Sequence, residues 1–60
     1  MHVVTLNTAG EMSYLANDGQ FYISPNKAKP FRKKRAAQAA LDNLPAHFQK
    51  MGDLKILLKN

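Results

Sequence analysis

Residues 27–44, KAKPFRKKRAAQAALDNL, decide the fold of this chain. Pro30 disfavours helical backbone at the residue before it, so a helix is predicted to begin just after Pro30. From there an apolar stripe recurs at i, i+3, i+4 and i+7, which is typical of a helix that buries one face. The stripe consists of Ala37, Ala40, Leu41 and Leu44. Pro45 follows the stripe and ends the helix, because proline lacks an N–H and clashes with the preceding turn.

The cations of this stretch occupy a place that is unfavourable for stability. Four are predicted to lie in the first helical turn, where the peptide dipole is already positive, and two lie just upstream. They are Arg32, Lys33, Lys34 and Arg35 in the turn, and Lys27 and Lys29 before it. Each cation in the turn should cost about 0.3–1 kcal/mol at low salt, and no acidic residue lies within four positions to relieve it. We therefore expect an anionic or acidic partner; the alternative interpretation is a solvated face that only keeps the chain in solution.

Length and composition restrict the classes of protein that this chain can belong to. Sixty residues without cysteine predict one small domain over residues 1–60, with a marginal core and neither disulfides nor a thiolate metal site. Such a core needs idealised packing or oligomerisation, so a homodimer is left open. The N-terminus lacks the pattern of a signal peptide and no apolar run could span a membrane, which favours the cytoplasm. Nine Lys and Arg against four Asp and Glu give a net charge of +5, which favours nucleic acid or an acidic protein surface as partner.

Short strands are predicted on both sides of the helix. Residues 2–6 form a β-branched run, and residues 53–59 alternate in the manner of a strand, although a C-terminal helix is left open there. Residues 12–16 and 21–24 are predicted to form a hairpin around Asp18-Gly19 as a two-residue type I′ turn. Residues 45–51 should form a short second helix, capped by Asn43 and ended by Gly52. Phe48 and Met51 should cover one end of the core.

The predicted hairpin register assigns each side chain to one face of a sheet. It pairs Leu15 with Tyr22 and Tyr14 with Ile23, and a slip of one residue would exchange the two faces. The set expected to face the helix is Met12, Tyr14, Ala16, Phe21 and Ile23. The set expected on the open face is Ser13, Leu15, Tyr22, Ser24, Lys55, Leu57 and Lys59, with Val3 and Thr5. The fold class is therefore α+β: a three- to four-stranded antiparallel sheet with one helix packed on one face, in the order β-β-β-α-short helix-β.

Catalysis, metals and cofactors are not indicated by the sequence. The four acids, Glu11, Asp18, Asp42 and Asp53, fit turn, helix and strand-start positions, and no two are placed as an acid/base pair. His2 and His47 belong to no motif with ligand spacing, and there is no Gly-rich phosphate loop. We therefore predict no catalytic residue, no metal and no cofactor; a small enzyme whose acid/base pair forms only on folding is a third alternative.

The basic residues around the start of the helix, together with an aromatic side chain and two lysines expected on the open face, predict a binding site. The residues are Lys27, Lys29, Arg32, Lys33, Lys34, Arg35, Tyr22, Lys55 and Lys59. Proteins that read single-stranded nucleic acid stack bases on sheet aromatics between basic residues, and Tyr22 is the aromatic predicted to point outward here. Alternatively, Tyr22 and Leu15 form a cross-strand pair that stabilises the hairpin, or the apolar part of this face is a dimer or partner interface.

Residues 31–48, FRKKRAAQAALDNLPAHF, resemble a pattern found in small phage-encoded accessory proteins. In that pattern a hairpin leads to an aromatic, a basic patch, an alanine-rich helix, then Leu-Pro and a second aromatic. The matching residues are Phe31, Lys34, Ala37, Ala40, Leu41, Leu44, Pro45 and Phe48. The resemblance covers the second half of the chain and implies a stand-alone protein without activity of its own, which covers a surface of a host enzyme such as a polymerase, a nuclease or a defence complex.

Two functions are therefore expected. The first is a non-enzymatic, phage-type protein that binds and modulates or inhibits a host protein in the host cytoplasm. The alternative is direct binding of DNA or RNA through the basic start of the helix. Both use the same cations, and they differ in the partner and in the dependence of binding on salt.

Overall fold

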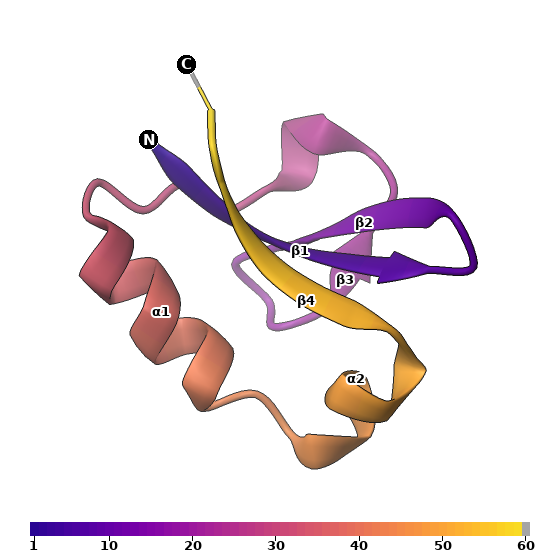
Figure 1. The fold of residues 1–60 in the computed structure, drawn as a ribbon. Coiled ribbons are helices and arrows are strands. Elements are labelled where there is room, and N and C mark those ends of the chain that lie inside the picture. The colour runs from indigo at the N-terminus through magenta and orange to yellow at the C-terminus, as the bar shows by residue number, and fades with distance from the viewer. Residues whose placement is uncertain (60) are drawn as a thin grey trace.

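Four antiparallel strands form one sheet in the computed structural model, which describes residues 1–59 (Figure 1). The strands are β1 (His2–Thr8), β2 (Glu11–Leu15), β3 (Phe21–Tyr22) and β4 (Asp53–Leu58), in the spatial order β3-β2-β1-β4. The helices are the 3₁₀ turn η1 (Pro25–Lys27), α1 (Lys34–Asp42) and α2 (Ala46–Met51). The predicted α+β fold is confirmed, and residues 53–58 form a strand rather than a helix. Within residues 1–59, no helix has both the length and the apolar character needed to cross a membrane.

The core lies between α1 and one face of the sheet. Four buried side chains form its centre: Val4, Leu15, Phe31 and Ala37. Around them pack Phe21, Ala40, Leu41, Leu44 and Ile56, so the apolar stripe predicted from the sequence is confirmed. Ala37 is 0 % exposed, since its small side chain lets the helix backbone approach the sheet closely.

The β2–β3 hairpin differs from the predicted register by one residue. Leu15 pairs with Phe21 and Tyr14 pairs with Tyr22, because the connecting loop has three residues, 17–19, instead of two. Gly19 closes this loop at φ +83°, and its N–H donates to the Ala16 carbonyl at 3.1 Å. A type I turn followed by a left-handed glycine is a common three-residue hairpin, and Asp-Gly is compatible with this loop as well as with the two-residue turn.

The change of register exchanges the two faces of β2. Leu15 is buried in the core against α1, whereas Met12 and Tyr14 lie on the opposite face. The prediction that Met12 and Tyr14 face the helix was therefore wrong, and so was the prediction that Leu15 lies on the open face. Ile23 follows β3 directly and is 63 % exposed. The physical reason is that this register buries Leu15 and Phe21 together beneath the helix, which the turn sequence alone does not select.

A two-residue turn does occur, but it joins β1 to β2. Ala9 and Gly10 connect the paired residues Thr8 and Glu11, and both have positive φ, +52° and +85°. Positive φ at both central residues is the mark of a type I′ turn, whose twist matches that of the flanking strands.

Helix α1 begins at Lys34, later than the position just after Pro30 that the sequence predicts. Phe31 forms an antiparallel bridge with His2, with N–H to carbonyl distances of 2.7 and 2.8 Å. This bridge keeps the backbone extended and places the Phe31 ring in the core. Arg32 and Lys33 therefore precede the helix, and the prediction that they lie in its first turn was wrong.

The junction between α2 and β4 depends on Gly52. Pro45 is the N-cap of α2, whereas Asn43 is the C-cap of α1, so the predicted capping role of Asn43 was wrong. Gly52 ends α2 as predicted. A Cβ added there would lie 2.0 Å from the Asn7 carbonyl oxygen of β1, so only glycine fits this close approach.

One side chain of α2 covers the end of the core. The ring of Phe48 packs on that of Phe21, with centroids 5.0 Å apart. Met51 is 51 % exposed and covers the core less than predicted.

Candidate functional site

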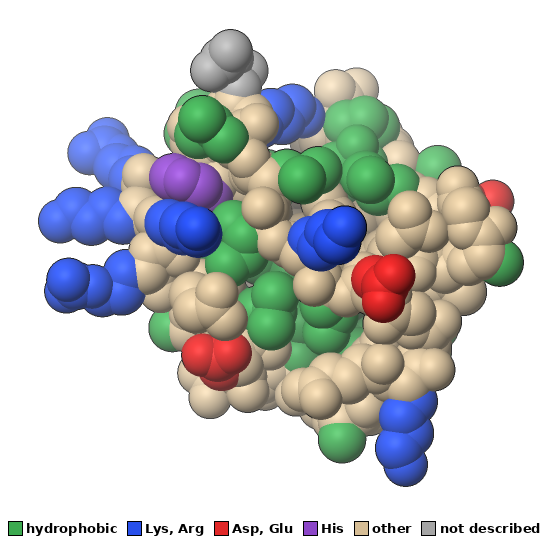
Figure 2. All heavy atoms as spheres, viewed as in Figure 1, with side chains coloured by type: hydrophobic (Ala, Val, Ile, Leu, Met, Phe, Trp, Pro, Cys, Tyr) green, Lys and Arg blue, Asp and Glu red, His purple; other side chains and the backbone are tan. Residues whose placement is uncertain are grey.

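The predicted cations lie along one continuous stretch, residues 27–35, which we call the basic segment. Its charged residues are Lys27, Lys29, Arg32, Lys33, Lys34 and Arg35, and all six are exposed. The backbone between them is held to the sheet at two points: the Lys29 N–H donates to the Leu15 carbonyl at 2.8 Å, and Phe31 bridges to His2. Figure 2 shows Lys and Arg side chains projecting from the side of the molecule where α1 begins. The fold thus fixes the backbone of the segment and leaves its cations in solvent.

The start of α1 carries positive charge without local compensation. Its first turn contains Lys34 and Arg35 and no acidic residue, and the N-cap residue Lys33 makes no side-chain capping hydrogen bond. Asp42 lies at the opposite end of the helix, where its carboxylate accepts a hydrogen bond from Gln38 at 2.9 Å. The N–H groups of the first turn and the side-chain cations together make this end of the helix a favourable place for an anion.

Three lysines lie over aromatic rings. The Nζ of Lys27 is 4.7 Å from the centroid of the Tyr22 ring, and that of Lys59 is 5.8 Å from the Tyr14 ring. A third contact joins Lys29 to Phe31 at 5.2 Å. The first of these contacts joins the basic segment to the sheet face opposite α1, whereas Phe31 lies in the core and Lys59 lies outside the segment.

That face carries one row of side chains across all four strands. The register places Tyr22 of β3, Tyr14 of β2, Thr5 of β1 and Lys55 of β4 side by side. Thr5 is only 2 % exposed, and its hydroxyl donates to the Lys55 carbonyl at 3.3 Å. Of the other residues predicted for this face, Val3 and Leu57 lie on it, Val3 buried and Leu57 partly exposed.

Tyr14 is the residue that sequence reasoning missed. The predicted two-residue turn pointed its ring toward the helix, and the three-residue loop reverses it. The sequence does contain a signal for this position. The alternative register buries Leu15 and Phe21 together, and both are larger apolar groups than Ala16, which the predicted register buried beside Phe21.

Asp18 lies at the loop end of the tyrosine pair. The Tyr22 hydroxyl donates to one carboxylate oxygen of Asp18, and the Gln20 N–H donates to the other at 2.9 Å. The Tyr22 hydrogen bond is the main reason why the pKa of Asp18 is lowered from its ordinary 3.8, with smaller contributions from Gln20 and from the charge of Lys27. The same bond raises the pKa of Tyr22 from its ordinary 10.0. Asp18 is thus a stable negative charge that orients the Tyr22 ring.

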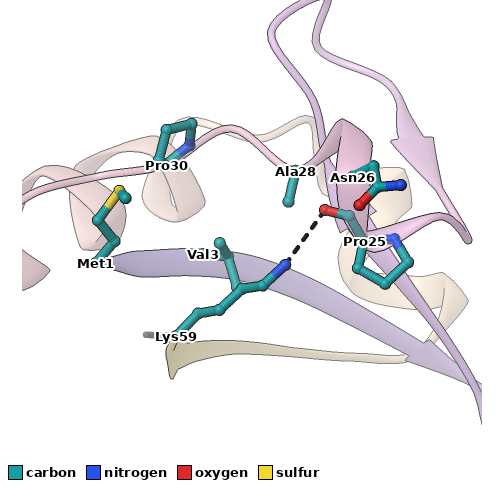
Figure 3. A pocket seen from close by; sticks show the side chains of 7 residues that line it. All are labelled: Met1, Val3, Pro25, Asn26, Ala28, Pro30 and Lys59. Carbon is teal, nitrogen blue, oxygen red and sulfur yellow. Dashed lines mark hydrogen bonds between the residues drawn. The ribbon is translucent and has the colours of Figure 1, made fainter.

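Lys59 connects the end of β4 to η1 across a hollow of about 220 Å³ (Figure 3). Its Nζ donates to the Pro25 carbonyl at 3.4 Å, and its stem lies beside Val3. The hollow is lined by Met1, Val3, Pro25, Asn26, Ala28, Pro30 and Lys59. The same Nζ also lies over the Tyr14 ring. Lys59 thus has two weak contacts, one with the Pro25 carbonyl and one with Tyr14, and neither is with a carboxylate.

The two histidines contribute no metal site among the described residues. The Nδ1 of His2 is buried without a hydrogen-bond partner, and the ring of His47 packs on Phe48 with centroids 4.2 Å apart. In residues 1–59, no three His, Asp or Glu side chains are grouped in a way that could hold a metal ion.

Comparisons with models of protein families, with curated proteins and with solved structures find no match to this chain.

Proposed function

We propose that this protein is a non-enzymatic nucleic-acid-binding protein that holds a phosphate backbone with the basic segment. The observation that carries the proposal is the arrangement of the six exposed cations. They begin at Lys27, which lies over the Tyr22 ring, and they end in the first turn of α1, which has no acidic residue and no side-chain cap. Cations that adjoin aromatic side chains are usual elements of sites that bind single-stranded nucleic acid.

The electrostatics of the free protein support this ligand. Lys34 and Arg35 repel the positive end of the α1 dipole, so each lowers the stability of the free fold by about 0.3–1 kcal/mol. A phosphate at the same place is attracted by the dipole, by the free N–H groups and by the cations together. Each phosphate that is neutralised also releases condensed counterions. An arrangement that destabilises the free protein therefore stabilises the complex.

The test measures the affinity of the protein for duplex and single-stranded DNA by fluorescence anisotropy at two salt concentrations. With about four phosphates contacted, the affinity should fall about 100-fold between 50 and 200 mM salt. Lys34→Glu should weaken binding at low salt by about tenfold or more, since it replaces a charged contact by a repulsive one.

The matched control is Lys50→Glu on α2, which changes the net charge from +5 to +3 just as Lys34→Glu does but lies outside the basic segment. It should weaken binding far less. Absence of binding to any nucleic acid at low salt would overturn the proposal. An equal loss in both variants would show that only the net charge matters, and would remove the role of the basic segment.

A second function is favoured by the edge strand β4. It lies at the border of the sheet, and Leu57 and Leu58 on it are 38 % and 70 % exposed. An exposed edge with apolar side chains can pair with a strand of another protein. This feature supports a protein as partner, which is the class of partner that the sequence resemblance implies for a phage-type protein.

The second function predicts one discrete host protein in a pull-down from nuclease-treated lysate. The variant Leu58→Lys should lose this protein if β4 makes the contact, and the double variant Arg32→Glu, Arg35→Glu should lose it if the basic segment does. Recovery of the same protein by both variants, in the amount that the unaltered chain recovers, would exclude both surfaces as its binding site.

A further inference from the structure

Two tyrosines are cross-strand neighbours on the sheet face opposite α1. Tyr14 and Tyr22 are directly opposite residues on the neighbouring strands β2 and β3. Directly opposite Cβ atoms are about 4.5–5.5 Å apart, so the two side chains leave the same part of this face, which we call the Tyr14–Tyr22 patch. Both side chains are half-buried, which holds the rings in place and leaves part of each in solvent.

A lysine lies over each of these rings. Lys27 lies over Tyr22 and Lys59 over Tyr14, at 4.7 and 5.8 Å from the ring centroids. Such contacts are weak at an exposed site, so another flat group can displace the lysine from the ring. The displaced ammonium group loses its weak attraction to the ring and is then free to meet the phosphate attached to the stacked base.

We infer that the Tyr14–Tyr22 patch is a stacking platform for single-stranded nucleic acid, with each ring taking one base. This inference rests on the proposed function, because the strand that supplies the bases continues along the basic segment. Lys27 belongs to both the patch and the segment, so a strand stacked on Tyr22 has its next phosphates beside residues 27–35. Asp18 carries a negative charge at the other end of Tyr22, and it repels a backbone that would leave over the loop.

The chemistry of the patch favours single strands over the alternatives. The faces of bases in a duplex are covered by their neighbours, whereas unpaired bases offer a π-face to an aromatic side chain. An acidic protein surface would be attracted by Lys27 and Lys59, but its carboxylates have no aromatic face that could replace the lysines on the two rings. Stacking also predicts little dependence on base identity, because every base has a π-face.

The chain supplies its own reporter for this binding. It contains two tyrosines and no tryptophan, so its intrinsic tyrosine emission comes from this patch alone. We expect an unlabelled single strand of about ten nucleotides, a length within the range of single-strand sites, to quench this emission with saturation at low salt. A duplex of the same length should bind through the basic segment and quench far less.

Four variants separate stacking from other roles of the rings. Tyr14→Leu and Tyr22→Leu should each lower the affinity for the single strand by about 5- to 150-fold, the range that base–aromatic stacking gives, and should leave duplex binding unchanged. Tyr14→Phe and Tyr22→Phe keep the rings and should bind as the unaltered chain does. Tyr22→Phe also removes the hydrogen bond to Asp18, so it separates the ring from its hydroxyl. Circular dichroism of each variant shows that the fold is retained.

The outcomes distinguish this inference from the proposed function. Equal binding of single strand and duplex, unchanged in the Leu variants, overturns the platform and leaves the proposed function standing. No binding of either at low salt overturns both. A loss of affinity in the Phe variants as large as that in the Leu variants overturns stacking. Quenching by poly-glutamate as strong as that by the single strand also overturns it, because the patch would then respond to charge alone.

Discussion

Replacing Lys33 by aspartate should stabilise the protein and weaken its binding at the same time. Lys33 is the N-cap of α1 at φ −113° and ψ 141°, the extended conformation in which a capping side chain reaches the N–H groups of the first turn. No capping hydrogen bond is present, and the first turn has no acidic residue. The position therefore has the backbone of a capped helix without the side chain that caps it.

The expected gain follows from three terms. A capping hydrogen bond contributes about 1 kcal/mol, the removal of a cation at the positive end of the dipole about 0.3–1 kcal/mol, and the added carboxylate a similar amount. Their sum is about 2 kcal/mol, a large fraction of the roughly 3–5 kcal/mol that a core of this size supplies. For a chain of 60 residues this should raise the Tm by about 10 °C.

Thermal unfolding followed by circular dichroism measures the gain, and anisotropy at low salt measures the loss of affinity for nucleic acid. The matched control is Lys33→Ala, which removes the charge without supplying a cap and should raise the Tm by only a few degrees. A Tm of Lys33→Asp at or below that of the unaltered chain would refute the reasoning about the helix start. Tighter binding of DNA by Lys33→Asp would refute an anionic ligand at this end of α1.

Three further changes test the fold and the tyrosine patch. Gly52→Ala should cost about 3 kcal/mol in urea unfolding, because its Cβ would lie 2.0 Å from the carbonyl oxygen of Asn7 in the central strand; a cost below 1 kcal/mol would contradict this close approach. Ala9→Asn should stabilise the protein by about 0.5–1 kcal/mol in the same assay, since asparagine tolerates the φ of +52° that alanine disfavours; an unchanged midpoint would argue against the type I′ turn. The hydrogen bond between Tyr22 and Asp18 lowers the pKa of Asp18 below 3.8 and raises that of Tyr22 above 10.0, so its contribution to stability is present between these values. It is lost as the pH falls through the folded-state pKa of Asp18, and as the pH rises through that of Tyr22. Asp18→Asn should therefore let Tyr22 ionise at a lower pH in an absorbance titration, and an unchanged titration would show that the bond is absent in solution.

The unfavourable charges of the basic segment lie where the backbone is held by other contacts. The basic segment is fastened by the Lys29 hydrogen bond to Leu15 and by the bridge between Phe31 and His2. The Phe31 ring adds burial in the core at the same point. The repulsion between the cations and the positive end of the α1 dipole is thus offset by contacts of the backbone and of the Phe31 ring. The cations themselves remain available to a ligand.

Most helices and strands of this protein follow from local patterns in its sequence. The alternation of residues 53–59 predicts β4, and the spacing of Ala37, Ala40 and Leu41 predicts the buried face of α1, because burial on one side of a strand or helix requires those periods. The α+β fold with one helix on an antiparallel sheet follows from these elements, since each apolar face needs a partner. The six cations of the basic segment were also evident, and the structure leaves all of them exposed.

Contacts between distant parts of the chain select which side chains share a face and where α1 begins. Asp18-Gly19 is compatible with a two-residue and with a three-residue loop, and the choice depends on whether Leu15 or Tyr14 is buried beneath α1. A strand has a period of two, so this one choice moved Tyr14 beside Tyr22 and formed the patch on which the stacking inference rests. In the same way, the bridge of Phe31 to His2 joins residues far apart in the chain, and its hydrogen bonds override the local helical preference after Pro30.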